Sequence, residues 1–170
     1  LEETLVKPKD KAVVFAIYEG EIEAILARYP QYRPRAIYGG VTERESTKAW
    51  QDFQKPSDPG QLIVCQSHSG GRGIDLYAAR TAIFYTRDYS LEAYSQAVKR
   101  LHRIGQTGTV RVIHLIARLP RPVGRRTRPV SIDESIAKVL DRKTSLARMV
   151  LEPVKYGTSM IRETVNEVLS

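Results

Sequence analysis

Residues 61–86 read QLIVCQSHSGGRGIDLYAARTAIFYT and place a glycine-rich loop between two short apolar runs. The runs Leu62–Cys65 and Ala82–Tyr85 contain β-branched and aromatic residues, which is typical of buried strands in a parallel sheet. Glycines in the loop permit positive φ and the close approach of a ligand or another backbone. The loop therefore predicts either a plain turn or a phosphate-binding loop, and its candidate residues are Ser67, Ser69, Gly70, Gly71 and Gly73.

A second pattern follows in QAVKRLHRIGQT, residues 96–107. On a helix with roughly 100° per residue, Gln96, Arg100 and Arg103 lie within an arc of about 60°. We expect a helix from Leu91 to about Arg103 whose two arginines face away from the core. Two guanidiniums one turn apart suit the spread charge of a phosphoryl group in transfer, while the alternative is an amphipathic surface helix with solvated arginines.

The remaining sequence alternates between strand-like and helix-like segments. Thr42 followed by Glu45 is a capping box that predicts a helix start, and Ser131 with Glu134 repeats it. Such alternation implies an α/β fold with parallel strands, right-handed crossovers and helices on both faces of the sheet. The expected strands are 12–17, 35–38, 62–65, 82–85 and 109–116, and the expected helices are 20–28, 43–53, 91–103 and 132–150.

Taken in order, SGGRGIDL, a strand and QAVKRLHRIGQT resemble motifs V and VI of the superfamily-two helicase-like ATPases. HRIGQ is similar to the Swi/Snf-type DNA translocases in particular, and KAVVFAIYEGEIEAI upstream resembles motif IV. The resemblance covers roughly residues 11 to 150. It implies a C-terminal RecA-like lobe, which is P-loop-NTPase-like but lacks the P-loop.

Two features of these motifs bear on the branch of the superfamily. Asp75 stands where Swi/Snf proteins usually carry Asn, and RGID is also the form found in DEAD-box RNA helicases. Gln106 and Thr109, however, stand where the DEAD-box motif has arginines. We therefore expect a lobe of a DNA translocase, with an RNA helicase lobe and a non-catalytic nucleic-acid-binding scaffold as the alternatives.

The resemblance implies which residues meet ATP. Neither a GxxxxGK[ST] loop nor an acidic magnesium motif occurs in the sequence. We therefore expect a first RecA-like lobe of the same protein to hold most of the ATP and Mg²⁺ contacts, and the isolated chain to be inactive. The resemblance implies that this lobe supplies two arginine fingers, Arg100 and Arg103. Gln96 would help to register motif VI across the cleft. The expected nucleotide contacts are Gly71, Gly73 and Asp75.

By the same resemblance, the lobe binds the phosphate backbone of double-stranded DNA and reads no bases. The candidate residues are Gly39, Thr42, Ser67, His68 and Arg72. A further basic stretch, LPRPVGRRTRPV at residues 119–130, holds four arginines and no acid, and so supplies +4 of the net charge of +8. Its prolines predict a loop that either lies on a phosphate backbone, through Arg125, Arg126 and Arg128, or is solvated.

Composition and organisation agree with a motor lobe inside the cell. No apolar run approaches the ~20 residues that span a bilayer, and the single cysteine, Cys65, favours a reducing compartment. We expect a monomer without a metal site of its own, located in the nucleus or with the nucleoid in the cytoplasm. The expected segments are a RecA-like lobe at 1–118, a linker at 119–130, and a brace-type helix with its tail at 131–170, with an apolar stripe of Ile132, Ile136, Leu140, Ala147 and Val150.

Overall fold

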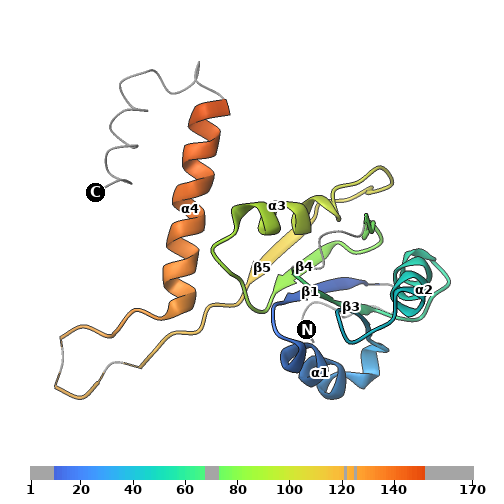
Figure 1. Ribbon diagram of the computed structural model, residues 1–170, viewed down its shortest axis with the longest axis horizontal. Coiled ribbons are helices and arrows are strands. Elements are labelled where there is room, and N and C mark those ends of the chain that lie inside the picture. The colour runs from blue at the N-terminus through green and yellow to red at the C-terminus, as the bar shows by residue number, and fades with distance from the viewer. Residues whose placement is uncertain (1–9, 68–72, 121, 125, 152–170) are drawn as a thin grey trace. The chain divides into compact units, whose positions relative to one another are not determined.

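The computed structural model describes residues 10–67, 73–120, 122–124 and 126–151 (Figure 1). These residues fall into two compact units. The first runs to Asp88 and resumes over Glu92–Leu115, and the second contains Tyr89–Leu91 and the residues from Ile116 onward. Within the described ranges, no helix is both long and apolar enough to cross a bilayer.

The first unit is built on a five-stranded sheet in the order β2-β3-β1-β4-β5. All four neighbouring pairs are parallel, and β1 at the centre pairs Phe15 with Cys65 of β3 on one side and with Phe84 of β4 on the other. The predicted α/β fold with a parallel sheet is confirmed. The strands are β1 (Ala12–Ala16), β2 (Arg35–Ile37), β3 (Leu62–Gln66), β4 (Thr81–Phe84) and β5 (Arg111–His114).

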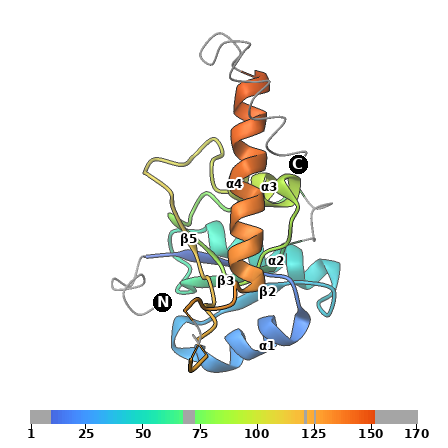
Figure 2. The same ribbon diagram turned by 90° about the vertical axis from the view of Figure 1, so that its left-hand side faces the viewer.

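Helices cover both faces of this sheet, as expected. Because side chains alternate along a strand, Val13 and Phe15 of β1 point to one face and Ala12, Val14 and Ala16 to the other. The first set packs with residues of α2 (Glu43–Gln54) and α3 (Leu91–Lys99), and the second with α1 (Glu19–Arg28). Figures 1 and 2 both show α1 on the side of the strands opposite α3.

Both predicted capping boxes are present. At the start of α2, the Glu45 amide donates to Thr42 Oγ1 at 3.3 Å and the Thr42 amide donates to Glu45 Oε2 at 3.1 Å. At the start of α4 (Ile132–Leu151), Ser131 and Glu134 exchange the same pair of bonds at 3.2 and 3.0 Å. Each box satisfies two amides that a helix N-terminus leaves without an intrahelical partner.

Helix α3 ends earlier than the sequence pattern predicts, at Lys99 and not near Arg103. The chain then turns, and the carbonyl of Arg100 accepts a bond of 2.8 Å from the amide of Leu76 in the loop before β4. Gly105 follows at a φ of +106°, in the left-handed region that glycine tolerates. A tertiary hydrogen bond and a glycine thus end the helix one turn early.

The second unit is built on α4 and the segment that leads into it. Ser131 Oγ donates to the carbonyl of Ala117 at 2.5 Å, and the amide of Ala117 donates to Asp133 Oδ2 at 2.8 Å. These bonds tie Ala117, two residues before the linker, to the first turn of α4. Of the predicted apolar stripe, Ile136 and Leu140 are buried whereas Ile132 is 64% exposed. The side chain of Val150 and the segment 152–170 lie outside the described residues.

Candidate functional site

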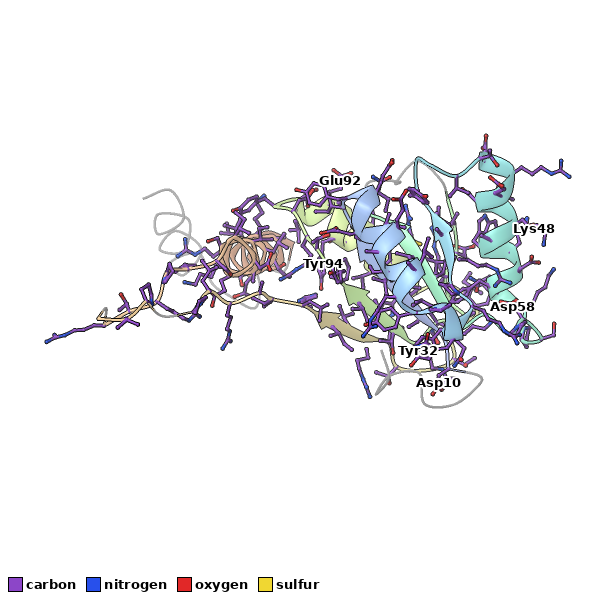
Figure 3. All side chains as sticks on the ribbon, turned by 90° about the horizontal axis from the view of Figure 1, so that it is seen from below. Asp10, Tyr32, Lys48, Asp58, Glu92 and Tyr94 are labelled. Atoms are coloured by element: carbon purple, nitrogen blue, oxygen red, sulfur yellow. The ribbon has the colours of Figure 1, made fainter. Side chains whose placement is uncertain are left out.

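The predicted site residues divide between the two ends of the parallel sheet. Figure 3 shows Asp10 and Tyr32 at the end where the strands begin and Glu92, at the start of α3, at the other. Helices between parallel strands run back along the sheet, so α2 and α3 end where the strands begin. Lys11, just before β1, accordingly donates to the carbonyl of Phe53 near the end of α2 at 2.5 Å. The arginines after α3 therefore lie at one end of the sheet, and Gly39 and Ser67, which follow β2 and β3, at the other.

An ion pair joins the two motifs at the first end. Arg103 Nε lies 3.2 Å from Asp75 Oδ1, and the two side chains are 53% and 40% exposed. Close by in sequence, a Cβ added to the exposed Gly73 would meet no atom within 4 Å. The loop of residues 73–79, which we call the Asp75 loop, thus offers Arg103 a carboxylate and leaves open space beside its glycine. Gly71 lies outside the described residues.

The position of Arg100 differs from the helical-wheel expectation, in which both arginines face away from the core. Its residue surface is 7% exposed, so it does not share the solvent face that was expected for both arginines. Helix α3 ends at Lys99, so the helical wheel does not extend through residues 100–103, and the buried Arg100 side chain interacts electrostatically with Cys65. Burial lowers the pKa of the Arg100 guanidinium and raises the pKa of the Cys65 thiol to about 12. Cys65 is thus a packed thiol in a buried strand, as expected.

Gln96 stands apart from the two arginines in its contacts. The side chain is exposed on α3, and its amide donates to Glu92 Oε1, one turn earlier, at 3.0 Å. This i to i+4 pair belongs to the surface of the helix. A role for Gln96 in registering motif VI stays a prediction.

Two other glutamines, Gln54 and Gln106, hold the Asp75 loop in place. Gln54 at the end of α2 donates to the carbonyl of Asp75 at 2.6 Å and accepts from the amide of Ala78 at 2.9 Å. Gln106 donates to the carbonyls of Tyr77 and Ala79 at 3.0 and 2.9 Å. The sequence placed Gln106 in motif VI but indicated this holding role for neither glutamine, because nothing local in the sequence reveals these long-range bonds.

At the opposite end of the sheet, Gly39 and Ser67 are linked through Gln66. The amide of Gly39 donates to Gln66 Oε1 at 3.3 Å, and Gln66 Nε2 donates to the carbonyl of Ile17 at 3.1 Å. Ser67 Oγ is buried and has no hydrogen-bond partner within the described part of the chain. The carboxyl ends of parallel strands are where open α/β sheets bind ligands, so this end of the sheet is the candidate phosphate-binding end.

The other predicted DNA-contacting residues differ in whether their side chains are already engaged within the protein. The hydroxyl of Thr42 is engaged by its capping box and donates to Glu45 Oε2 at 2.6 Å. In the linker, Arg126 is exposed, whereas Arg128 forms a two-pronged ion pair with Glu134 and lowers the pKa of that carboxyl to about 2. His68, Arg72 and Arg125 lie outside the described residues.

Comparisons with known proteins bear on this arrangement. Residues 1–105 match the helicase conserved C-terminal domain family. Over 94 residues, 53% of this chain and 5% of the relative, the sequence is 41% identical to the chromatin-remodeling ATPase INO80 of Cryptococcus neoformans. Over 135 residues, 75% of this chain and 24% of the relative, it is 28% identical to the ATP-dependent RNA helicase DBP3 of Candida glabrata.

Among solved structures, the C-terminal part of the Fun30 ATPase domain is similar to this chain with a TM-score of 0.66. The match covers 82% of this chain and 41% of that one at 21% sequence identity, and it identifies the fold as RecA-like. The chain spans only a small part of the length of these curated relatives.

Proposed function

Since this chain belongs to the helicase conserved C-terminal domain family, in its Swi/Snf-type branch, we propose that it is the second motor lobe of an ATP-dependent translocase acting on double-stranded DNA. The observation that carries the proposal is the pairing of Arg103 with Asp75 across motifs V and VI. It gathers a half-exposed guanidinium, a carboxylate and an open glycine loop at one end of a RecA-like sheet. Relatives that are ATPases support ATP hydrolysis by the full protein.

In this proposal the lobe acts on ATP through Arg103. A guanidinium stabilises the charge that spreads over the phosphoryl oxygens in transfer, and an arginine finger contributes largely through position. The Asp75 carboxylate keeps the Arg103 side chain near the glycine loop until the more highly charged γ phosphate arrives. Arg100 supports the same turn from within the core, and Gly73 leaves room for the nucleotide.

The Mg²⁺ that accompanies ATP is assigned to the first lobe. Among the described residues, no group of three or more His, Cys, Asp or Glu side chains is placed to hold a metal ion. When bound, the ion would neutralise phosphate charge.

DNA would bind at the opposite end of the sheet, where Gly39 and Ser67 lie. Amide and hydroxyl groups there contact phosphates without reading bases, so binding should be indifferent to sequence. Closing and opening of the cleft between two lobes would change the grip of each lobe on the backbone and move the protein along DNA. A chromatin-associated role, by analogy with INO80, would place the protein in the nucleus, and we expect it to act as a monomer.

An RNA helicase lobe is the second candidate, because Asp75 matches the DEAD-box form and the similarity to DBP3 covers 75% of this chain. Gln106 and Thr109 favour the DNA branch. The test is the ATPase rate of the full-length protein with duplex DNA, single-stranded DNA or duplex RNA. We expect duplex DNA to stimulate most and the 170-residue chain alone to show no turnover above background. Stronger stimulation by duplex RNA would support the second candidate, and turnover by the isolated chain would contradict the half-site assignment.

The linker offers a prediction on DNA binding by this chain. Arg126→Ala should flatten the slope of log affinity against log salt by about 0.9, the value for one phosphate contact on duplex DNA. Arg128→Ala should leave the slope nearly unchanged, because Glu134 already engages that guanidinium. The measurement is a salt series of binding titrations for both variants. Equal slopes for wild type and Arg126→Ala would identify the linker as a solvated loop.

A further inference from the structure

Gln106 makes an unusual set of hydrogen bonds for one side chain. Its Nε2 donates to the carbonyls of Tyr77 and Ala79, and its Oε1 accepts from the amide of Gly108 at 3.1 Å. Its own amide donates to the carbonyl of Arg103 at 3.0 Å and closes the turn that carries Arg103. Only an amide side chain of this length donates twice and accepts once in this way.

Three links therefore join the Asp75 loop to residues 100–106, which we call the arginine turn. They are the bond from Leu76 to the carbonyl of Arg100, the Arg103–Asp75 ion pair, and the bonds of Gln106. The ion pair is half exposed, and an exposed pair of this kind contributes too little to hold a side chain in one position. Gln106, whose bonds are partly buried, is better placed to set the geometry.

Local packing supports this assignment. Gly105, next to Gln106, lies against the ring of Tyr77, since an added Cβ would come within 3.2 Å of that ring. Gln106 also borders a cavity of about 300 Å³, together with Gln54 and Tyr77. The side chain is thus not enclosed by packing on all sides, and its hydrogen bonds determine where the turn sits.

We propose that Gln106 is a positioning residue for the motor reaction: it fixes the arginine turn on the Asp75 loop, so that Arg103 is presented to ATP in one orientation. This inference rests on the proposed function of Arg103. Displacement of a catalytic group by about 1 Å is enough to cost roughly 10²-fold in rate, so a loosened turn should lower turnover without removing any group that touches ATP.

Gln54 provides a matched control. It also holds the Asp75 loop with one donated and one accepted bond, at Asp75 and Ala78, but it comes from α2, and both of these bonds go to the Asp75 loop and not to the arginine turn. Replacing either glutamine by methionine keeps the length of the side chain and removes the hydrogen bonds. A general weakening of the loop would affect both variants alike, whereas loss of finger position would affect only Gln106→Met.

The test compares Gln106→Met, Gln54→Met and Arg103→Ala in the full-length protein by ATP turnover with duplex DNA. We expect Gln106→Met to lower kcat by roughly 10²-fold with little change in KM for ATP, and Gln54→Met to keep kcat within about threefold. In the Arg103→Ala background, Gln106→Met should have almost no further effect, because two residues that act through one group are not additive.

Equal kcat values for the two methionine variants, or full additivity with Arg103→Ala, would overturn the inference about Gln106. Should Gln106→Met fail to fold, the shorter Gln106→Asn carries the same cycle, with the same expected loss of kcat and the same non-additivity. The proposed function is tested separately by Arg103→Ala. Near-normal turnover in that variant would contradict the proposed function, irrespective of the result for Gln106→Met.

Discussion

Arg103→Ala in the full-length protein is expected to lower DNA-stimulated ATP turnover by roughly 10³-fold or more, the scale on which loss of an arginine finger acts. The side chain is half exposed and its ion-pair partner Asp75 is also accessible to solvent, so the free energy of unfolding should change by less than about 1 kcal/mol. The measurements are steady-state ATPase rates and thermal unfolding of the same preparations.

Arg28→Ala is the control for this substitution. Arg28 is an exposed arginine in the last turn of α1, on the face of the sheet opposite α3, and its removal changes the net charge equally. It should leave turnover near the wild-type value. Near-normal turnover in Arg103→Ala would show that Arg103 is a solvated surface arginine. It would support the alternative interpretation of residues 91–103 as an amphipathic surface segment.

Arg100→Ala should give a different result, in which stability falls together with activity. Arg100 is 7% exposed and its guanidinium interacts electrostatically with the buried Cys65, so the substitution leaves a cavity and removes a buried charged group. We expect the free energy of unfolding to fall by about 1–3 kcal/mol, the usual cost of disrupting a buried polar group. Denaturant unfolding of the 170-residue chain measures this directly.

A stability change in Arg100→Ala as small as that in Arg103→Ala would contradict the buried position of Arg100. The distinction matters for the mechanism, since a loss of turnover in Arg100→Ala combines a weakened fold with any lost contact to ATP. Only Arg103, with its accessible guanidinium, allows the finger role to be measured by itself.

Local patterns in the sequence predicted most of the fold. The apolar runs at 62–65 and 82–85 became β3 and β4 because strands buried on both faces exclude polar residues. Thr42 with Glu45, and Ser131 with Glu134, mark helix starts because a capping box needs only residues three positions apart. The family resemblance likewise rested on continuous stretches of sequence, which the match over residues 1–105 confirms.

The candidate site depended more on tertiary contacts. The helical wheel placed Arg100 on the solvent face because it assumed that α3 continues, whereas the bond from Leu76 takes the Arg100 carbonyl and ends the helix at Lys99. The same contacts bring Arg103 to Asp75 and give Gln54 and Gln106 their partners in the Asp75 loop. The apolar periodicities of strands and helices, two and 3.6 residues, are local, and so are capping boxes, whose two residues stand three positions apart. The sequence by itself therefore determined the elements and their order. Which arginine is buried, and what holds the other in place, was decided only by the tertiary structure, because the partners of these residues, Leu76 for Arg100 and Asp75 for Arg103, lie more than twenty residues away in the sequence.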